Sequence, residues 1–180
     1  MQENIQIVQP ILEDAIESIE VQYRAWLETY PNKKAGVTKE DVEERYKDAF
    51  TGSKLEKRKK IITDPEPNEK FIIAKDRDRV VGMCYGDVQE DKNQLKAIYI
   101  LPEYHGKGIG TKLWEALYPF FNNTNDTYVE VVDYNEKAIS FYKKLGFVDT
   151  GKRFQDERFR MKSGAIFTEM EMVKKAESSQ

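Results

Sequence analysis

The segment LKAIYILPEYHGKGIG, residues 95–110, decides the fold predicted for this chain of 180 residues. Its apolar first half, residues 95–101, predicts a β-strand that Pro102 closes. Three alternating glycines follow. Apolar residues then recur at spacings of three and four, which predicts a helix over 109–121 that kinks or ends early at Pro119. A bare glycine turn before a helix start exposes backbone N–H groups that favour an anion.

The segments on either side show either the alternation typical of strands or the spacing of three and four typical of helices. Thr38 and Asp41 resemble a capping box for one predicted helix. Gly82 and Gly86 mark either bulges or a close approach by another group in a predicted hairpin. The first predicted strand is marked by Ile5, Ile7 and Val8 and ends at Pro10. The other predicted strands cover residues 71–74, 80–88, 95–101, 128–132, a segment beginning at 147, and 166–173. The predicted helices cover residues 12–30, 38–50, 109–121 and 135–145, and a basic run at 54–60 is interpreted as the solvated face of a further helix.

The order of these elements predicts the fold class. One strand, two or three helices and three strands are followed by helix, strand, helix and two strands, which indicates an α/β domain with one twisted mixed sheet and helices on both faces. The connection from 95–101 through a helix to 128–132 has the length used between parallel strands and should be right-handed. We predict one domain over residues 1–175 and a polar tail at 176–180.

Composition narrows the function classes. Lys and Arg number 29 and Asp and Glu 32, a net charge of −3, so no basic excess indicates a nucleic acid or an anionic membrane as partner. A single cysteine, Cys84, excludes an intramolecular disulfide. The start of the sequence lacks the basic and apolar regions of a signal peptide, and no apolar run approaches the ~20 residues of a membrane span. We therefore expect a cytoplasmic protein.

Three kinds of anion-binding loop compete for the glycine segment. A Walker loop requires Gly, four residues and Gly-Lys-Ser/Thr, which the sequence does not contain. A dinucleotide fingerprint counted from Gly106 and Gly108 requires a third glycine at position 111, where Thr111 stands. The strand, the Pro-containing turn and the glycines together resemble the pyrophosphate loop of the GNAT superfamily of N-acetyltransferases, with the pattern Gln/Arg-x-x-Gly-x-Gly/Ala. The sequence departs from this pattern at His105, which stands where the family has Gln or Arg.

A second segment, NEKAISFYKKLGF at 135–147, resembles the family's Asn-x-x-Ala-x-x-Phe-Tyr-x-x-x-Gly-Phe signature. The residues of this segment also predict a helix with defined ends, because Asn135 is a favourable N-cap and Gly146 suits the left-handed residue after a helix. Tyr142 lies two turns after Asn135 on nearly the same side of the helix, so both should line one cleft. The two signatures occur in the family's order, separated by one helix and one strand.

The resemblance implies an N-acetyltransferase that uses acetyl-CoA as co-substrate and needs neither a metal nor an acyl-cysteine. It implies a single domain with a mostly antiparallel sheet splayed between strands 4 and 5, where the pantetheine arm bonds the main chain of Ile98 and Ile100. Tyr99 should point to the opposite face. The cofactor-binding residues implied are Ile98, Tyr99, Ile100, His105, Gly106, Lys107, Gly108, Ile109, Gly110, Thr111, Asn135, Lys137, Ala138 and Tyr142.

The resemblance assigns chemistry to few side chains. Tyr142 is the general acid for the leaving thiolate, since a phenol with a pKa near ~10 stays protonated at neutral pH. Glu130, on strand 128–132, is a possible base, and Asp133 at that strand's end is an alternative. His105 is expected beside the pyrophosphate rather than at the reacting amine, and Cys84 is expected in the core.

The sequence leaves the acceptor open. We expect a small cationic amine such as a polyamine, and a peptide or protein N-terminus or lysine is the alternative. A non-catalytic acyl-CoA-binding regulatory module is the alternative of another class. The aromatic residues of the first two helices could contact a cationic amine, although most of them have core spacing. The chain is expected to be a monomer or a homodimer.

Overall fold

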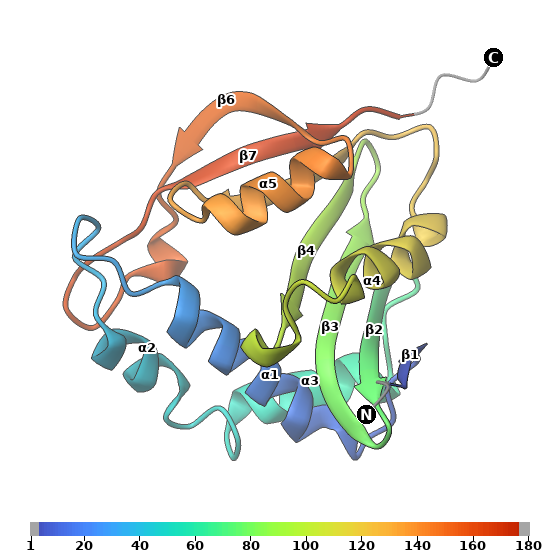
Figure 1. The fold of residues 1–180 in the computed structure, drawn as a ribbon, viewed down its shortest axis with the longest axis horizontal. Helices are drawn as coiled ribbons and strands as arrows, with labels where there is room; N and C mark the ends of the chain where they lie inside the picture. The colour runs from blue at the N-terminus through green and yellow to red at the C-terminus, as the bar shows by residue number, and fades with distance from the viewer. Residues whose placement is uncertain (1–3, 177–180) are drawn as a thin grey trace.

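The computed structural model describes residues 4–176 and arranges seven strands in one mixed sheet, in the order β1-β2-β3-β4-β5-β7-β6 (Figure 1). Of the neighbouring pairs in this sheet, β4 and β5 run parallel and the others antiparallel, as predicted. The strands are β1 Ile5–Val8, β2 Glu69–Asp76, β3 Arg79–Val88, β4 Asn93–Ile100, β5 Thr127–Val132, β6 Val148–Phe154 and β7 Glu169–Lys174.

Helices cover both faces of the sheet, which confirms the predicted α/β class (Figure 1). α1, α2 and α3 lie against one face, and α4 and α5 lie against the other. The α-helices are α1 Asp14–Thr29, α2 Lys39–Tyr46, α3 Ser53–Thr63, α4 Ile109–Leu117 and α5 Glu136–Lys144. Short 3₁₀ turns lie at Pro102–Tyr104, Tyr118–Phe120 and Glu157–Phe159. The helix predicted over 109–121 thus ends early, because Pro119 lacks the N–H that a further turn would use.

The sheet opens between its two parallel strands. β4 and β5 pair only from Asn93↔Thr127 to Leu95↔Val129, after which neither strand has a partner in the other. β5 continues to pair with β7 up to Val132↔Glu169, and β4 with β3 up to Gly82↔Ile100. Beyond Leu95 the backbone groups of β4 that point toward β5 therefore have no ladder partner. The predicted splay between strands 4 and 5 is confirmed.

Both glycines predicted to mark bulges lie where strand registers shift. The β2–β3 register shifts after Ala74, which pairs with Gly82, and the β3–β4 register shifts between Tyr85 and Gly86. The second shift leaves Lys96 as the extra residue of β4. Because it lies just after the last β4–β5 pair, this bulge helps β4 to diverge from β5.

The basic run at 54–60 only partly faces solvent, so the prediction of a solvated helix face is wrong for Arg58. Its guanidinium bonds Gln22 Oε1 at 2.8 Å and lies 4.7 Å from the centre of the Phe71 ring. Burial lowers the pKa of Arg58 to about 10. Lys57 and Lys60 are exposed as predicted. The long aliphatic stem of arginine allows it to lie between α3 and the sheet.

Near its C-terminal end the chain differs from the predicted pattern in where the last strand begins. The last strand begins at Glu169, later than the predicted 166, because Phe167 packs into the core below α1 instead of joining the ladder. The Ala176 N–H donates to Asp126 Oδ1 at 2.9 Å, so the predicted tail is held at its first residue. Residues 177–180 of that tail, and Met1, Gln2 and Glu3 at the start, lie outside the described residues. Among residues 4–176 no helix is both long and apolar enough to cross a membrane.

The capping box at the start of α2 also connects this helix to the segment before β7. Asp41 Oδ2 accepts from the Thr38 N–H at 2.9 Å, and its two oxygens accept from the N–H and the hydroxyl of Ser163 at 2.9 and 2.8 Å. Burial alone would raise the pKa of the Asp41 carboxyl, but these hydrogen bonds outweigh it and lower the pKa.

We expect Asp41→Ala to reduce the free energy of unfolding by about 1–3 kcal/mol, because three part-buried donors lose their acceptor at once and the helix loses its capping box. Asp41→Asn keeps one acceptor oxygen and should lose less. Urea unfolding of the three proteins at pH 7 measures the difference. An Ala variant as stable as the wild type would show that water replaces the carboxylate.

Candidate active site

A cavity of about 710 Å³ occupies the opening between β4 and β5. The starts of α4 and α5, the diverging ends of β4 and β5, and the end of α1 form its walls. It is of the size that holds a cofactor or small ligand. Of the predicted site residues, it is lined by Ile98, Tyr99, Ile100, His105, Gly106, Gly108, Ile109, Gly110, Thr111, Glu130, Asn135, Lys137, Ala138 and Tyr142.

Lys107 is the predicted cofactor residue that does not line the cavity. Its ammonium lies 4.7 Å from the centre of the Tyr104 ring. Gly106 and Gly108, on either side of Lys107 in the sequence, both line the cavity.

The start of α4 presents bare backbone to the cavity. Gly106 and Gly108 have φ of +77° and +74°, the left-handed region that glycine adopts without strain. Gly108 is the N-cap of α4, no side chain caps the helix, and a Cβ at this position would meet no atom within 4 Å. The first N–H groups of α4 and its dipole are therefore free to hold an anion.

Gly110 serves packing rather than backbone freedom. A Cβ at this position would lie 3.1 Å from the Phe141 ring and 3.2 Å from Ile100 Cδ1. The glycine thus lets α4 approach α5 and β4 closely. This approach fixes the start of α4 against the open end of β4.

The β4 wall offers main-chain groups, as predicted, but one of them has a partner. His105 Nε2 lies 3.1 Å from the carbonyl oxygen of Ile100. The side chain that replaces the family's Gln or Arg thus reaches back to the strand. Tyr99 points to the opposite face, where its hydroxyl accepts from Trp26 Nε1 at 3.1 Å. The predicted alternation along β4 is confirmed.

Tyr142 reaches the cavity from α5. Asn135 Oδ1 accepts from the Ala138 N–H at 3.1 Å and caps the helix start, and Gly146, with φ of +91°, ends the helix, both as predicted. Only 6 % of Tyr142 is exposed. Burial, with the neighbouring Tyr99 phenol and Cys84 thiol, raises its pKa, so the hydroxyl keeps its proton at any physiological pH.

The other side of the opening is aromatic. Tyr30, at the end of α1, lines the cavity together with Tyr99, and burial, followed by the Tyr99 phenol, raises the pKa of Tyr30. Trp26 stacks on Tyr30 with 3.9 Å between ring centres. Tyr46 belongs to the core, as predicted for most of these aromatic residues. The cavity thus joins the α4–α5 side of the sheet to the α1 side.

Of the two carboxylates proposed as the base, only one reaches the cavity. Glu130 is exposed and lines the cavity, whereas Asp133 is exposed and does not line it. Cys84 is fully buried in the core, as predicted, and burial raises the pKa of its thiol. Within residues 4–176 no group of three or more His, Cys, Asp or Glu side chains lies close enough together to hold a metal ion.

A buried carboxyl beside the site, Glu169, escaped the sequence analysis. It is 6 % exposed, and its Oε2 has no hydrogen-bond partner. Burial, followed by the charges of Glu130 and Asp156, raises its pKa to about 7. Its alternation with the buried Met170 and Met172 is the pattern of a solvent-facing residue, so no local signal marks it.

The model of the acetyltransferase (GNAT) family matches residues 39–147. N-alpha-acetyltransferase 30 of Schizosaccharomyces pombe is 35 % identical over 83 residues, 42 % of this chain and 55 % of that protein. Thialysine N-epsilon-acetyltransferase of Mus musculus is 34 % identical over 79 residues, 39 % of this chain and 46 % of that protein. The chain thus matches about half the length of these curated relatives.

Solved structures share the fold. PaiA N-acetyltransferase from Thermoplasma acidophilum in complex with coenzyme A aligns with a TM-score of 0.70 and 24 % identity, covering 96 % of this chain and 99 % of that one. Arabidopsis thaliana NAA60 in complex with a bisubstrate analogue aligns with a TM-score of 0.60 and 14 % identity, covering 94 % and 97 %. At these identities the likeness concerns the fold.

Proposed function

Since this chain belongs to the acetyltransferase (GNAT) family, we propose that it transfers the acetyl group of acetyl-CoA to a primary amine, by direct attack in a ternary complex. The observation that supports this most is the junction of an uncapped helix start and an open parallel strand pair in one cavity. Residues 1–175 are proposed to form one such domain.

The cavity fits the two chemically distinct parts of the cofactor. The pyrophosphate would lie on the N–H groups that follow Gly108, where the helix dipole and the lack of side chains favour an anion. The pantetheine arm would run along β4 beyond Leu95 and bond the unpaired groups of Ile98. His105, which already contacts the Ile100 carbonyl, would either keep this contact or exchange it for the cofactor.

The proposed reaction uses the acid at the cavity wall. A neutral amine nitrogen attacks the thioester carbonyl carbon, the C–N bond forms and the C–S bond breaks. Tyr142 gives its proton to the departing sulfur, and the surplus proton on the nitrogen restores the phenol. An alkyl ammonium has a pKa of about 10, so it must lose a proton before it attacks. Glu130, the carboxylate that lines the cavity from β5, is the proposed group to remove it.

A cationic amine of small size is the proposed acceptor. Glu28 and Glu130 lie on the cavity wall toward α1, where Tyr30 and Tyr99 add aromatic surface. Carboxylates and aromatic rings together suit an ammonium group with an alkyl chain. A peptide N-terminus or a lysine is the alternative acceptor, since the curated relatives include both a thialysine and an N-alpha-acetyltransferase.

A panel of amines tests the proposal. We expect CoA release from acetyl-CoA with spermidine, lysine or thialysine, and a smaller rate with short peptides that carry a free α-amine. The measurement is thiol release at pH 8 against reactions without amine. If acetyl-CoA stabilises the protein but no amine or peptide is acetylated, the chain is the non-catalytic acyl-CoA-binding module instead.

A further inference from the structure

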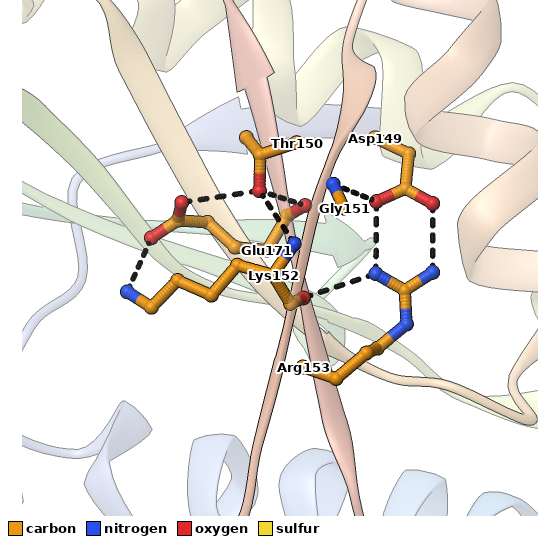
Figure 2. A network of polar contacts seen from close by, with 6 residues as sticks. All are labelled: Asp149, Thr150, Gly151, Lys152, Arg153 and Glu171. Atoms are coloured by element: carbon orange, nitrogen blue, oxygen red, sulfur yellow. Dashed lines mark hydrogen bonds and ion pairs between the residues drawn. The ribbon is translucent and has the colours of Figure 1, made fainter.

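The carboxyl of Glu169 is buried, and its Oε2 has no hydrogen-bond partner, unlike the oxygens of Glu171 on the same strand. The lack of a partner costs about 1–3 kcal/mol or more for a charged group. Glu171, two residues further on β7, is the contrasting case. Its oxygens accept from Thr150 Oγ1 at 3.2 Å and from Lys152 Nζ at 2.9 Å (Figure 2).

The strand register brings Glu169 next to Glu130. Glu130 pairs with Glu171 and Val132 pairs with Glu169, so Glu130 and Glu169 are diagonal neighbours. Directly paired residues share one sheet face, and residues two apart on a strand do too, so both carboxyls project to the α1 side. Long side chains on such diagonals reach each other. Glu130 lines the cavity, and Glu169 lies behind it.

The other groups around Glu169 do not neutralise it. Asp156 repels its charge, and Arg158 attracts it, but Arg158 Nε is bonded to Asp156 Oδ2 at 2.7 Å. Tyr30 and Tyr99, from α1 and β4, are close enough for the Glu169 charge to raise the pKa of both phenols. Both line the cavity. A proton is therefore the partner that Glu169 Oε2 lacks. This proton would come from the cavity.

We infer that Glu169 is the final acceptor of the proton that the substrate amine loses, and that Glu130 passes it on from the cavity. This inference rests on the proposed function. The ammonium N–H bond breaks and its proton passes to the Glu130 carboxylate. Glu130 then transfers this proton to Glu169. The lone pair left on the amine nitrogen attacks the carbonyl carbon of the thioester. Glu169 then releases the proton to solvent through Glu130 after the product leaves. A carboxyl that titrates near neutrality is a better proton acceptor for an amine than an ordinary one.

The pH dependence of kcat/KM tests this assignment. We expect the wild-type rate to rise through a midpoint near pH 7 and Glu169→Gln to lose at least about tenfold at pH 7, with its midpoint at least one unit lower. The loss should shrink toward pH 9.5, where free amine is more abundant. Glu171→Gln removes a partnered carboxylate from the same strand face and should keep the wild-type profile. A Glu169→Gln variant that is slower at an unchanged midpoint would make the residue merely structural.

Stability checks that this variant folds. A carboxyl whose pKa is raised from 4.5 to about 7 binds its proton more tightly in the folded state. The wild type should therefore lose stability as pH rises from about 4.5 to 7, and Glu169→Gln should melt higher than wild type at pH 8 but not at pH 4.5.

A measurement without turnover separates this inference from the proposed function. ¹³C NMR of the glutamate carboxyl carbons should show one resonance with a midpoint near pH 7 that Glu169→Gln removes and Glu171→Gln keeps. A Glu169 carboxyl that titrates below pH 5 would overturn the inference, whatever the amine panel gives. If this titration is found but no amine reacts, the result contradicts the proposed function and leaves the assignment of the Glu169 pKa intact.

Discussion

Replacing Gly108 by Glu is expected to abolish the stabilisation of this protein by acetyl-CoA. At about 100 times its Kd a ligand stabilises the folded state by about 2.7 kcal/mol, or roughly 5–10 °C in melting temperature for a chain of this size. A carboxylate at position 108 would stand in the open space at the start of α4, where the pyrophosphate is proposed to bind. Repulsion between the two anions should reduce the shift below about 1 °C.

A matched variant separates charge from backbone strain. Gly108→Ala forces the same left-handed φ of +74° on a residue with a Cβ but adds no charge. It should melt lower than wild type without ligand yet keep most of the acetyl-CoA shift, as measured by differential scanning fluorimetry. A full shift in Gly108→Glu would mean that the diphosphate lies elsewhere, and the proposed cofactor position would be wrong.

Replacing Tyr142 by Phe is expected to lower kcat about 100-fold or more, with a much smaller effect on acetyl-CoA binding. The phenol is the proton donor proposed for the leaving sulfur, and such a donor is worth roughly 10²–10⁴ in rate. Phe retains the ring, which packs against Phe141 and Phe147 with centres 5.4 and 5.7 Å away, so α5 should keep its place. Steady-state kinetics and the acetyl-CoA melting shift measure the two effects separately.

Tyr85 provides the control for this substitution. It is a half-buried tyrosine on β3 that does not line the cavity. Tyr85→Phe should therefore leave kcat within about twofold of wild type, since it removes a hydroxyl away from the reacting atoms. Equal turnover of Tyr142→Phe and wild type would remove Tyr142 from the mechanism and leave the thiolate to depart unprotonated.

Local sequence patterns predicted the parts of the site that a few neighbouring residues determine. The turn before α4, the N-cap at Asn135 and the helix end at Gly146 were all foreseen, because φ preferences and the bonding of helix ends act within one or two turns. The alternation along β4 likewise placed Tyr99 opposite Ile98. The resemblance to a known family added what local physics could not, namely the expectation that these pieces surround one cofactor.

The sequence by itself therefore determined the order of the elements, the bare helix start and the helix that presents Tyr142. Only the tertiary structure decided where β4 leaves β5, that Arg58 is half-buried, and that Glu169 Oε2 lies unpartnered on the strand next to Glu130. The physical reason is that burial and pKa depend on which distant segments pack together. Glu169 alternates with apolar residues as a solvated side chain would, yet it is buried. Tyr30 after α1, Tyr99 on β4 and Asp156 after β6 lie close enough to interact with its charge.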